Sequence, residues 1–535
     1  MANEVNAEFN SNQEETKVVP EASVDRHNME NLSLRQRLKN HGYRSKVMHT
    51  MYLGLTFIAL GMVVGQNGPT FLDLQIITNT DLEQASAFFT GASIGYLTGS
   101  ITAGTIYSRL NKNGLMFSGT LGMGIVAILT AYCKPYGLMI FIKFAGGVTA
   151  GFVDTCGNSE QMRIWGNEGQ GLMQFLHFAF AFGGVISPLY SAPFLAQKAT
   201  EHENSTIQSG NSSIAELVIG NFSILNDSSI VTTLGSDVVT NGTGDLTIVG
   251  NQETNVHIAF IITGIFSVLS GLPFLIFCLS DKISKKAAKS ATEAKITQRK
   301  LPKPMFVFIL FTLCLFYILY CCVEDTFASF LMTFLVREYT DVTKVEGAHI
   351  TAIYWASFAT SRFLMIFVAK FLSAVRLLYL CCTLMVIAFS SFIISAVAGN
   401  ILALTVFAAL AGLSMSAVFP AGFLFTETEL LRVTAPISSC ILVSASVGTM
   451  VNPLVLGYLM EEFSNMWFCY LLVGETLIVG AIFLFLLNFN RHFVNKRYGR
   501  LGSAVIASTI NVEEKETRQP LSATQDEVIV GNGSA

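Results

Sequence analysis

The sequence predicts an all-α membrane protein with twelve transmembrane helices arranged as two six-helix bundles. Composition is the first reason, since 51% of the 535 residues are hydrophobic and only 13% are charged, with a mean hydropathy of +0.52. A soluble domain carries about 25% charged residues, so this chain is too apolar for that class. The other reasons are the number of long apolar segments and one basic loop that divides them equally.

Twelve segments are long and apolar enough to span a bilayer, because a helix needs about 20 apolar residues to cross roughly 30 Å of hydrocarbon. An even number of spans returns the C-terminus to the side on which the N-terminus lies. The segments lie near 47–67, 82–107, 115–133, 136–158, 169–195, 256–279, 304–335, 348–371, 375–398, 400–426, 435–459 and 466–489.

Basic residues predict the topology. Lys and Arg gather just before the first span, between spans six and seven, and just after the last span. Such clusters are typical of the cytoplasmic side. We therefore expect a multi-pass plasma-membrane protein with both termini in the cytoplasm. Its parts are a cytoplasmic tail over 1–46, a bundle over 47–279, a cytoplasmic linker over 280–303, a second bundle over 304–489 and a cytoplasmic tail over 490–535.

A polar insert, residues 196–255, separates spans five and six. It contains five Asn-X-Ser/Thr sequons, on the side that the basic residues predict to be extracellular. We expect a glycosylated loop with little fold of its own. The acceptor residues are Asn204, Asn211, Asn221, Asn226 and Asn241.

Spans four and five each carry one polar, small-residue face. In span four the positions are Lys143, Gly147, Gly151, Asp154, Asn158 and Gln161, and in span five they are Gln174, His177, Ala181, Gly184 and Pro188. Steps of three or four place each set on one side of its helix. We expect the two faces to lie opposite each other across water. A charge at membrane depth is costly and marks a solute or ion path, so Asp154 is the first functional candidate.

The two halves of the chain contain related segments. Pro188 in GGVISPL corresponds to Pro453 in VGTMVNPLVLG, and Gly147 in span four corresponds to Gly412 in span ten. Repeated halves of this kind are typical of transporters whose site lies at the repeat interface near the bilayer midplane.

Short segments in both halves, in a fixed order, carry a family resemblance. They are GPTFLDL at 68–74, GYLTGS at 95–100, GFVDTCGN at 151–158 and MQFLHFAFAFGG at 173–184, then YCCVEDTF, IYWASFATSRF, GLSMSAVFPAGF and SVGTMVNPLVLG. Together they resemble the sodium-dependent glucose transporter branch of the major facilitator superfamily. The resemblance implies the major facilitator fold, alternating access and symport of sodium with a hexose. In one departure, GTIYSRLNKNG has Ser108 where the superfamily's loop motif usually has Asp.

A sugar site requires hydrogen-bond donors and acceptors, with an aromatic ring against the apolar face of the sugar. The candidate substrate-binding residues are Gln66, Asn67, Asn158, Gln161, Gln174, Tyr317, Tyr354 and Asn452. Sodium prefers oxygen ligands, among them carboxylates. Asp154 and Glu324, one in each half, are therefore the candidate ion-coupling residues, and Lys143 and Arg362 are their candidate charge partners. We predict no cofactor, and no metal apart from a sodium ion at Asp154.

Several charged candidates have a structural alternative. In the alternative for Asp154, its carboxylate forms an ion pair with Lys143 or Arg362 that only holds the bundle together. In the alternative for Lys143, its side chain extends to the outer headgroups. Glu324 and Asp325 lie instead at a hydrated extracellular helix end. Arg362 is either a structural counter-ion or a substrate donor.

Two further ionisable residues have structural interpretations. His177 is a packing residue or a proton carrier, and Glu475 in span twelve faces a peripheral surface or its helix neighbours. The ten cysteines have no metal-ligand spacing and are interpreted as packing residues.

Three functions are consistent with the sequence. Sodium-coupled uptake of glucose or a related hexose is the leading hypothesis, with sugar, sodium and the lipid bilayer as partners. An uncoupled or proton-coupled transporter or channel for another small polar solute is the second, and a non-transporting membrane protein of the same fold is the third. We expect neither an enzyme nor a nucleic-acid partner, since no metal set, nucleophile motif or phosphate loop is found.

Overall fold

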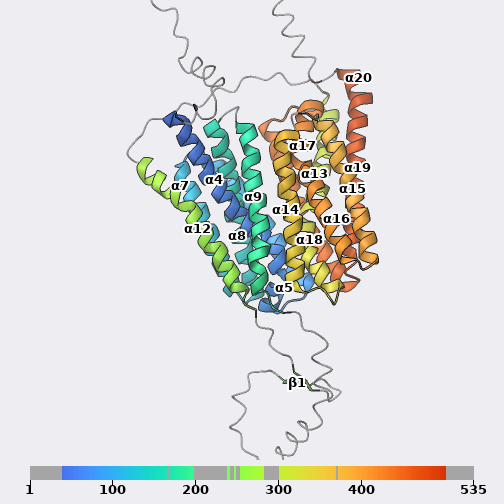
Figure 1. Cartoon of the computed structure of the whole chain (residues 1–535). Helices are drawn as coiled ribbons and strands as arrows, with labels where there is room; N and C mark the ends of the chain where they lie inside the picture. Colours follow the sequence, from blue (N-terminus) through green and yellow to red (C-terminus); the bar gives the residue numbers. More distant parts are fainter. Residues whose placement is uncertain are drawn as a thin grey trace, which may run out of the picture.

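Long helices, packed side by side in two groups, make up almost all of the described chain (Figure 1). The computed structural model describes residues 36, 39–165, 169–197, 238–240, 246–248, 254–281, 301–368, 371–499 and 501. The first group is the N-terminal bundle and the second is the C-terminal bundle.

The N-terminal bundle is built from three closely packed helix pairs, α6 with α8, α7 with α12 and α4 with α9. Its elements are α4 (His41–Gly65), α5 (Asn67–Thr78), α6 (Leu82–Ile106), α7 (Lys112–Tyr132), α8 (Tyr136–Trp165), α9 (Gly169–Ser191), the 3₁₀ turn η2 (Ala192–Phe194) and α12 (Val256–Asp281). Between η2 and α12 the short strands β1 (Val238–Thr240) and β2 (Leu246–Ile248) pair antiparallel, with Val238 opposite Ile248.

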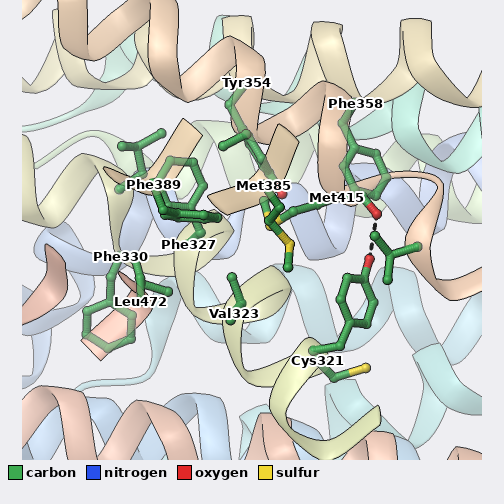
Figure 2. Close-up of a cluster of buried hydrophobic side chains, with 14 of the residues drawn as sticks. Cys321, Val323, Phe327, Phe330, Tyr354, Phe358, Met385, Phe389, Met415 and Leu472 are labelled. Carbon is green, nitrogen blue, oxygen red and sulfur yellow. Dashed lines mark hydrogen bonds between the residues drawn. The ribbon is translucent and has the colours of Figure 1, made fainter. Parts of the chain in front are cut away.

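The C-terminal bundle packs around the long helix α13, which contacts α14, α18 and α19. Its elements are α13 (Lys303–Glu338), α14 (Lys344–Val368), α15 (Ala374–Val397), α16 (Ile401–Met415), α17 (Val418–Phe425), the π turn η3 (Thr426–Leu430), α18 (Ala435–Glu462), α19 (Trp467–Phe489), the π turn η4 (Asn490–Val494) and α20 (Asn495–Tyr498). Aromatic side chains fill its core. Phe327 of α13 makes edge contacts with Phe389 and Tyr354 in the cluster of Figure 2.

Each of the twelve predicted spans coincides with a helix or a broken helix. Ten helices of the described chain are long and apolar enough to cross a membrane. The helices α6 and α14 are not among those ten. Both helices are continuous, but their sequences contain Ser, Thr and Gly among the apolar residues, which lowers their mean hydropathy. Their membrane crossing follows from their packing, since α6 lies along α8 and α18, and α14 lies along α9 and α16.

The first span is longer than the sequence predicts. We expected it to end near residue 67, but after a break at Gln66 the chain continues as α5 to Thr78. The shorter span was expected because the sequence from Gly65 to Pro69 is typical of a helix end. Pro69 stands in the first turn of α5, where its missing N–H removes no intrahelical bond. Span ten is also broken, between α16 and α17, with Pro420 in the first turn of α17.

The two bundles contact each other along two helix pairs and at one end. Helix α9 lies along α14, and α6 lies along α18. At the end that carries α5 and η2, those elements contact α13 and α14. We call this the outer end; the strand β1 also lies beyond it (Figure 1). The start of α4 and the end of α20 both lie at the opposite, inner end, on different sides of the molecule (Figure 1).

Candidate functional site

Asp154 lies in α8 with both carboxylate oxygens hydrogen-bonded. Oδ2 accepts from the Tyr96 hydroxyl of α6 at 2.5 Å, and Oδ1 accepts from Asn158 Nδ2 at 3.0 Å. No Lys or Arg nitrogen among the described residues lies within 4.0 Å of the carboxylate, so the alternative of an ion pair is wrong. For Lys143 the reason is spacing, because eleven residues of helix separate it from Asp154 by about 16 Å. The described hydrogen-bond partners of Asp154, a carboxylate at membrane depth, are therefore a phenol and an amide.

The polar face of α8 does not lie opposite that of α9, contrary to the expectation. Its glycines pack against α6 instead: a Cβ added to Gly151 would lie 2.1 Å from the carbonyl oxygen of Tyr96. Small residues let the two backbones approach closely, which is their usual role in membrane helices. The face of α9 contacts α14, where a Cβ on Gly184 would lie 2.6 Å from the indole of Trp355.

The seam between α9 and α14 collects polar atoms without partners. Arg362 Nε, Trp355 Nε1 and Gln174 Oε1 are all buried and make no hydrogen bond within the described structure. The Arg362 guanidinium lies 5.2 Å from the centre of the Phe358 ring, and its charge is within electrostatic range of His177 across the seam. Buried polar atoms are normally paired, so these three atoms are available to a ligand or water in the seam.

Glu324 and Asp325 lie in the middle of α13, 14 and 13 residues before its last residue, Glu338. The alternative of a hydrated helix end is therefore not what the structure shows. Arg362 is within electrostatic range of Glu324, although no nitrogen of a described Lys or Arg lies within 4.0 Å. Tyr320, one turn earlier, donates to the carbonyl of Met415 at 2.7 Å, the dashed line of Figure 2.

The two candidate tyrosines lie in different places. Tyr354 is fully buried on α14 near Phe327 and Phe358 (Figure 2), and its hydroxyl has no hydrogen-bond partner in the part of the chain that the structure describes. Tyr317 is also fully buried, but its ring contacts Phe419 and Phe423 of α17. Only Tyr354 lies beside the seam.

Asn67 and Lys143 are brought together at the outer end. Lys143 Nζ donates to Asn67 Oδ1 at 3.0 Å and lies 5.6 Å from the centre of the Phe260 ring. The side chain is only 9% exposed, so the prediction that it extends to the headgroups is wrong. Both residues line a cavity of about 10 Å³, which has room for about one water molecule.

Two other amide candidates are held within their own bundles. Gln66, 1% exposed, accepts from Thr263 at 2.7 Å. Asn452 donates to Thr326 at 2.8 Å and to Glu475 at 3.3 Å. The interpretation that Glu475 faces its helix neighbours thus agrees with the structure.

Gln161, the last amide candidate, lies near the inner end. Its Oε1 accepts from Thr50 at 3.3 Å, and Thr50 also accepts from Trp165 Nε1 at 2.8 Å. Gln161 therefore belongs to the contact between α4 and the end of α8, away from Asp154.

Sequence reasoning missed two buried ionic groups. The first joins Asp73 of α5 to Lys344 of α14, with 2.6 Å between Oδ1 and Nζ. The second is at the inner end, where Glu160 accepts from Arg163 at 2.5 Å and from the Tyr107 hydroxyl at 2.7 Å. Tyr107 precedes Ser108, the position at which the superfamily's loop motif usually has Asp. The Tyr107 hydroxyl therefore makes the contact between this loop and α8. The three-residue spacing of Glu160 and Arg163 was a signal from which their ion pair could have been predicted. Asp73 and Lys344 are 271 residues apart, and that separation gives no such signal.

The five sequons, Asn204, Asn211, Asn221, Asn226 and Asn241, lie outside the described residues.

No model of a known protein family matches the chain. It is 28% identical over 435 residues to the mouse protein named sodium-dependent glucose transporter 1A, covering 80% of this chain and 93% of that one. It is 27% identical to the human protein named sodium-dependent glucose transporter 1, covering 80% and 77%. A zebrafish protein named major facilitator superfamily domain-containing protein 4A is 23% identical, covering 82% and 87%.

Two solved structures have a similar fold. A bacterial homolog of the human lysosomal transporter Spinster, in an inward-facing and occupied conformation, aligns with a TM-score of 0.56 at 14% identity, over 86% of this chain and 98% of that one. The nucleoside transporter NupG aligns with a TM-score of 0.53 at 12% identity, over 82% and 99%. The mouse and human relatives and both solved structures are named as transporters or transporter homologs. The chain has the major facilitator fold, and its resemblance to the sodium-dependent glucose transporter branch of that superfamily is confirmed.

Proposed function

We propose that the protein is a sodium-coupled symporter that takes up glucose or a related hexose at the plasma membrane by alternating access. The observation that carries the proposal is Asp154, a membrane-depth carboxylate with two hydrogen-bond donors and no described Lys or Arg within 4.0 Å. An unpaired buried charge costs several kcal/mol, and a bound cation offsets that cost. The names of the curated relatives support sodium as the cation.

The proposed ion site uses Asp154 as a ligand, with Glu324 as the corresponding carboxylate of the second half. The Tyr96 hydroxyl hydrogen-bonds Oδ2 and orients the carboxylate. Asp154 lies in the N-terminal bundle and Glu324 in the C-terminal bundle. Binding of an ion first to one carboxylate and then to the other is therefore coupled to movement of one bundle relative to the other.

The proposed sugar site lies between α8 and the seam of α9 and α14. Asn158 Oδ1, Gln174 Oε1 and the Tyr354 hydroxyl are buried without a described partner. Hydroxyl-rich ligands satisfy such groups, and the cost of leaving each unpaired is about 1 to 3 kcal/mol. Trp355, on the same seam, offers an aromatic face of the kind that packs on a pyranose ring.

Coupling to protons is a second candidate, favoured by the same carboxylate, because protonation would also neutralise Asp154. Uptake into proteoliposomes separates the two. A panel of radiolabelled hexoses is offered with an inward sodium gradient, with choline in place of sodium, or with an inward proton gradient. We expect accumulation of a hexose only with sodium. Equal uptake in sodium and choline would refute sodium coupling, and accumulation driven by the proton gradient alone would establish the second candidate.

A further inference from the structure

The ion pair between Asp73 and Lys344 is unlike the other ionic contacts of the protein. The described residues form four ion pairs between a Lys or Arg and a carboxylate, and only this one joins the two bundles. Asp73 is fully buried and Lys344 is 6% exposed. In contrast, the Arg337–Glu461 pair, which lies within the C-terminal bundle, has side chains that are 31% and 29% exposed.

The second oxygen of Asp73 holds both ends of the insert 196–255. Oδ2 accepts from the backbone N–H of Ala196 at 2.8 Å and from the Thr254 hydroxyl. Ala196 follows η2, and Thr254 precedes α12. A single carboxylate thus connects α5, α14 and both ends of the insert.

An aromatic cluster begins two residues before Asp73 on α5, on the opposite side of that helix. Phe71 of α5, Phe89 of α6 and Phe330 of α13 contact one another, with ring centroids 4.7 to 5.4 Å apart. All three side chains are buried. Because they come from both bundles, the cluster closes the outer end between them with apolar surface.

A buried ion pair between the bundles favours a fully closed or a fully open outer end over the conformations between them. With the bundles together, each charge compensates the other; with the bundles apart at the outer end, both charges are hydrated. A state in which one charge stays buried alone is strongly unfavourable. A transporter that exposes its site to the outside must separate α5 from α13 and α14, and this separation breaks the pair.

We propose that Asp73 and Lys344 form the outer gate of the transporter, and that Asp73 couples this gate to the insert by holding Ala196 and Thr254. The residues act as positioning groups for the transport cycle and do not touch the solute. The proposal is independent of which solute or ion is carried.

The test measures access to a cysteine placed below the gate. Ala92 lines the small cavity that also includes Phe71 and Phe89, so Ala92→Cys reports when the outer end opens. Intact cells are treated with a membrane-impermeant maleimide, and the labelling rate is compared with that of the same protein without the added cysteine. In the Lys344→Met variant we expect labelling to be faster by about 10-fold or more, since a lone buried Asp73 disfavours the closed state.

A neutral double variant and two controls keep the test decisive. Asp73→Asn with Lys344→Met leaves no buried charge and keeps an acceptor for the insert, so it should fold and be labelled at close to the native rate. Arg337→Met removes an exposed ion pair at the same end and should leave labelling unchanged. Thr254→Val should increase labelling in the same direction, because it removes one of the insert's two bonds to Asp73. Unchanged labelling in Lys344→Met, labelling as fast in the double variant as in Lys344→Met, or an equal increase with Arg337→Met would overturn the gate. Unchanged labelling with Thr254→Val would overturn the coupling.

Discussion

Asp154→Asn is the most direct test of the proposed ion site. The substitution preserves shape, and the new amide retains both local hydrogen bonds. Its Oδ1 accepts from Asn158, and its Nδ2 donates to the hydroxyl oxygen of Tyr96, where Oδ2 now accepts at 2.5 Å. The variant also removes a charge that is costly to bury. We therefore expect normal amounts of folded protein at the cell surface.

Sodium dependence, in contrast, should be lost or greatly weakened. A hydrogen bond or ligand contact to a charged group is worth about 1.5 to 3 kcal/mol, which corresponds to an increase of about 10- to 150-fold in the sodium concentration for half-maximal uptake. The assay is hexose uptake by proteoliposomes at fixed sugar and increasing sodium, with choline keeping the ionic strength constant.

Glu475→Gln is the matched control for Asp154→Asn. Glu475 is also a buried carboxylate, 7% exposed, but its described hydrogen bond goes to Asn452 within the C-terminal bundle. Neutralising it should leave the sodium and sugar constants nearly unchanged. If Asp154→Asn responds to sodium at the native concentration, or if Glu475→Gln loses sodium dependence and Asp154→Asn does not, the assignment of the ion site is wrong.

Three further predictions concern the sugar site, the packing and the topology. Asn158→Ala should raise the apparent sugar constant in the same uptake assay by about 5- to 150-fold, from the penalty of about 1 to 3 kcal/mol for an unpaired buried partner; an unchanged constant would exclude Asn158 from the site. Gly95→Ala should lower the thermal unfolding temperature in detergent, because its Cβ would lie 2.0 Å from the Phe144 carbonyl oxygen, whereas Gly104→Ala on the same helix meets nothing within 4 Å and should not; equal temperatures would contradict the close α6–α8 contact. Peptide N-glycosidase should reduce the apparent mass of the surface protein, and its failure to do so would contradict an extracellular, glycosylated insert.

The span positions were predictable because a single physical quantity, the length of an apolar run, sets them. Predicted and observed ends of α6 agree at Leu82 and differ by one residue at the other end. The α5 extension was not predictable in the same way. It contains Asp73, whose carboxylate is accommodated by contacts with α14 and with both ends of the insert that only the tertiary structure supplies.

The candidate site was predictable only where its contacts are local. The step of four residues from Asp154 to Asn158 indicated a shared face, and the structure shows a hydrogen bond between them. The same periodicity also placed the glycines of α8 on a water-facing surface, which is wrong. Glycine at these positions allows close packing on α6, and a hydropathy pattern does not distinguish a packed small face from a hydrated one. Tyr96, the other partner of Asp154, lies on a different helix and carried no sequence signal.

The membrane-depth charges separate into two groups when their partners are considered. Near the two ends, Asp73 pairs with Lys344 and Glu160 pairs with Arg163. Between these ends, Asp154 and Glu324 have no described Lys or Arg within 4.0 Å. A charge that only holds helices together gains most from a permanent partner of opposite sign, because an unpaired one lowers stability. Carboxylates left unpaired between two paired groups are instead available to a ligand that enters and leaves. This arrangement favours the middle of α8 and α13 as the solute and ion path, with the inter-bundle pair of Asp73 and Lys344 at its outer end.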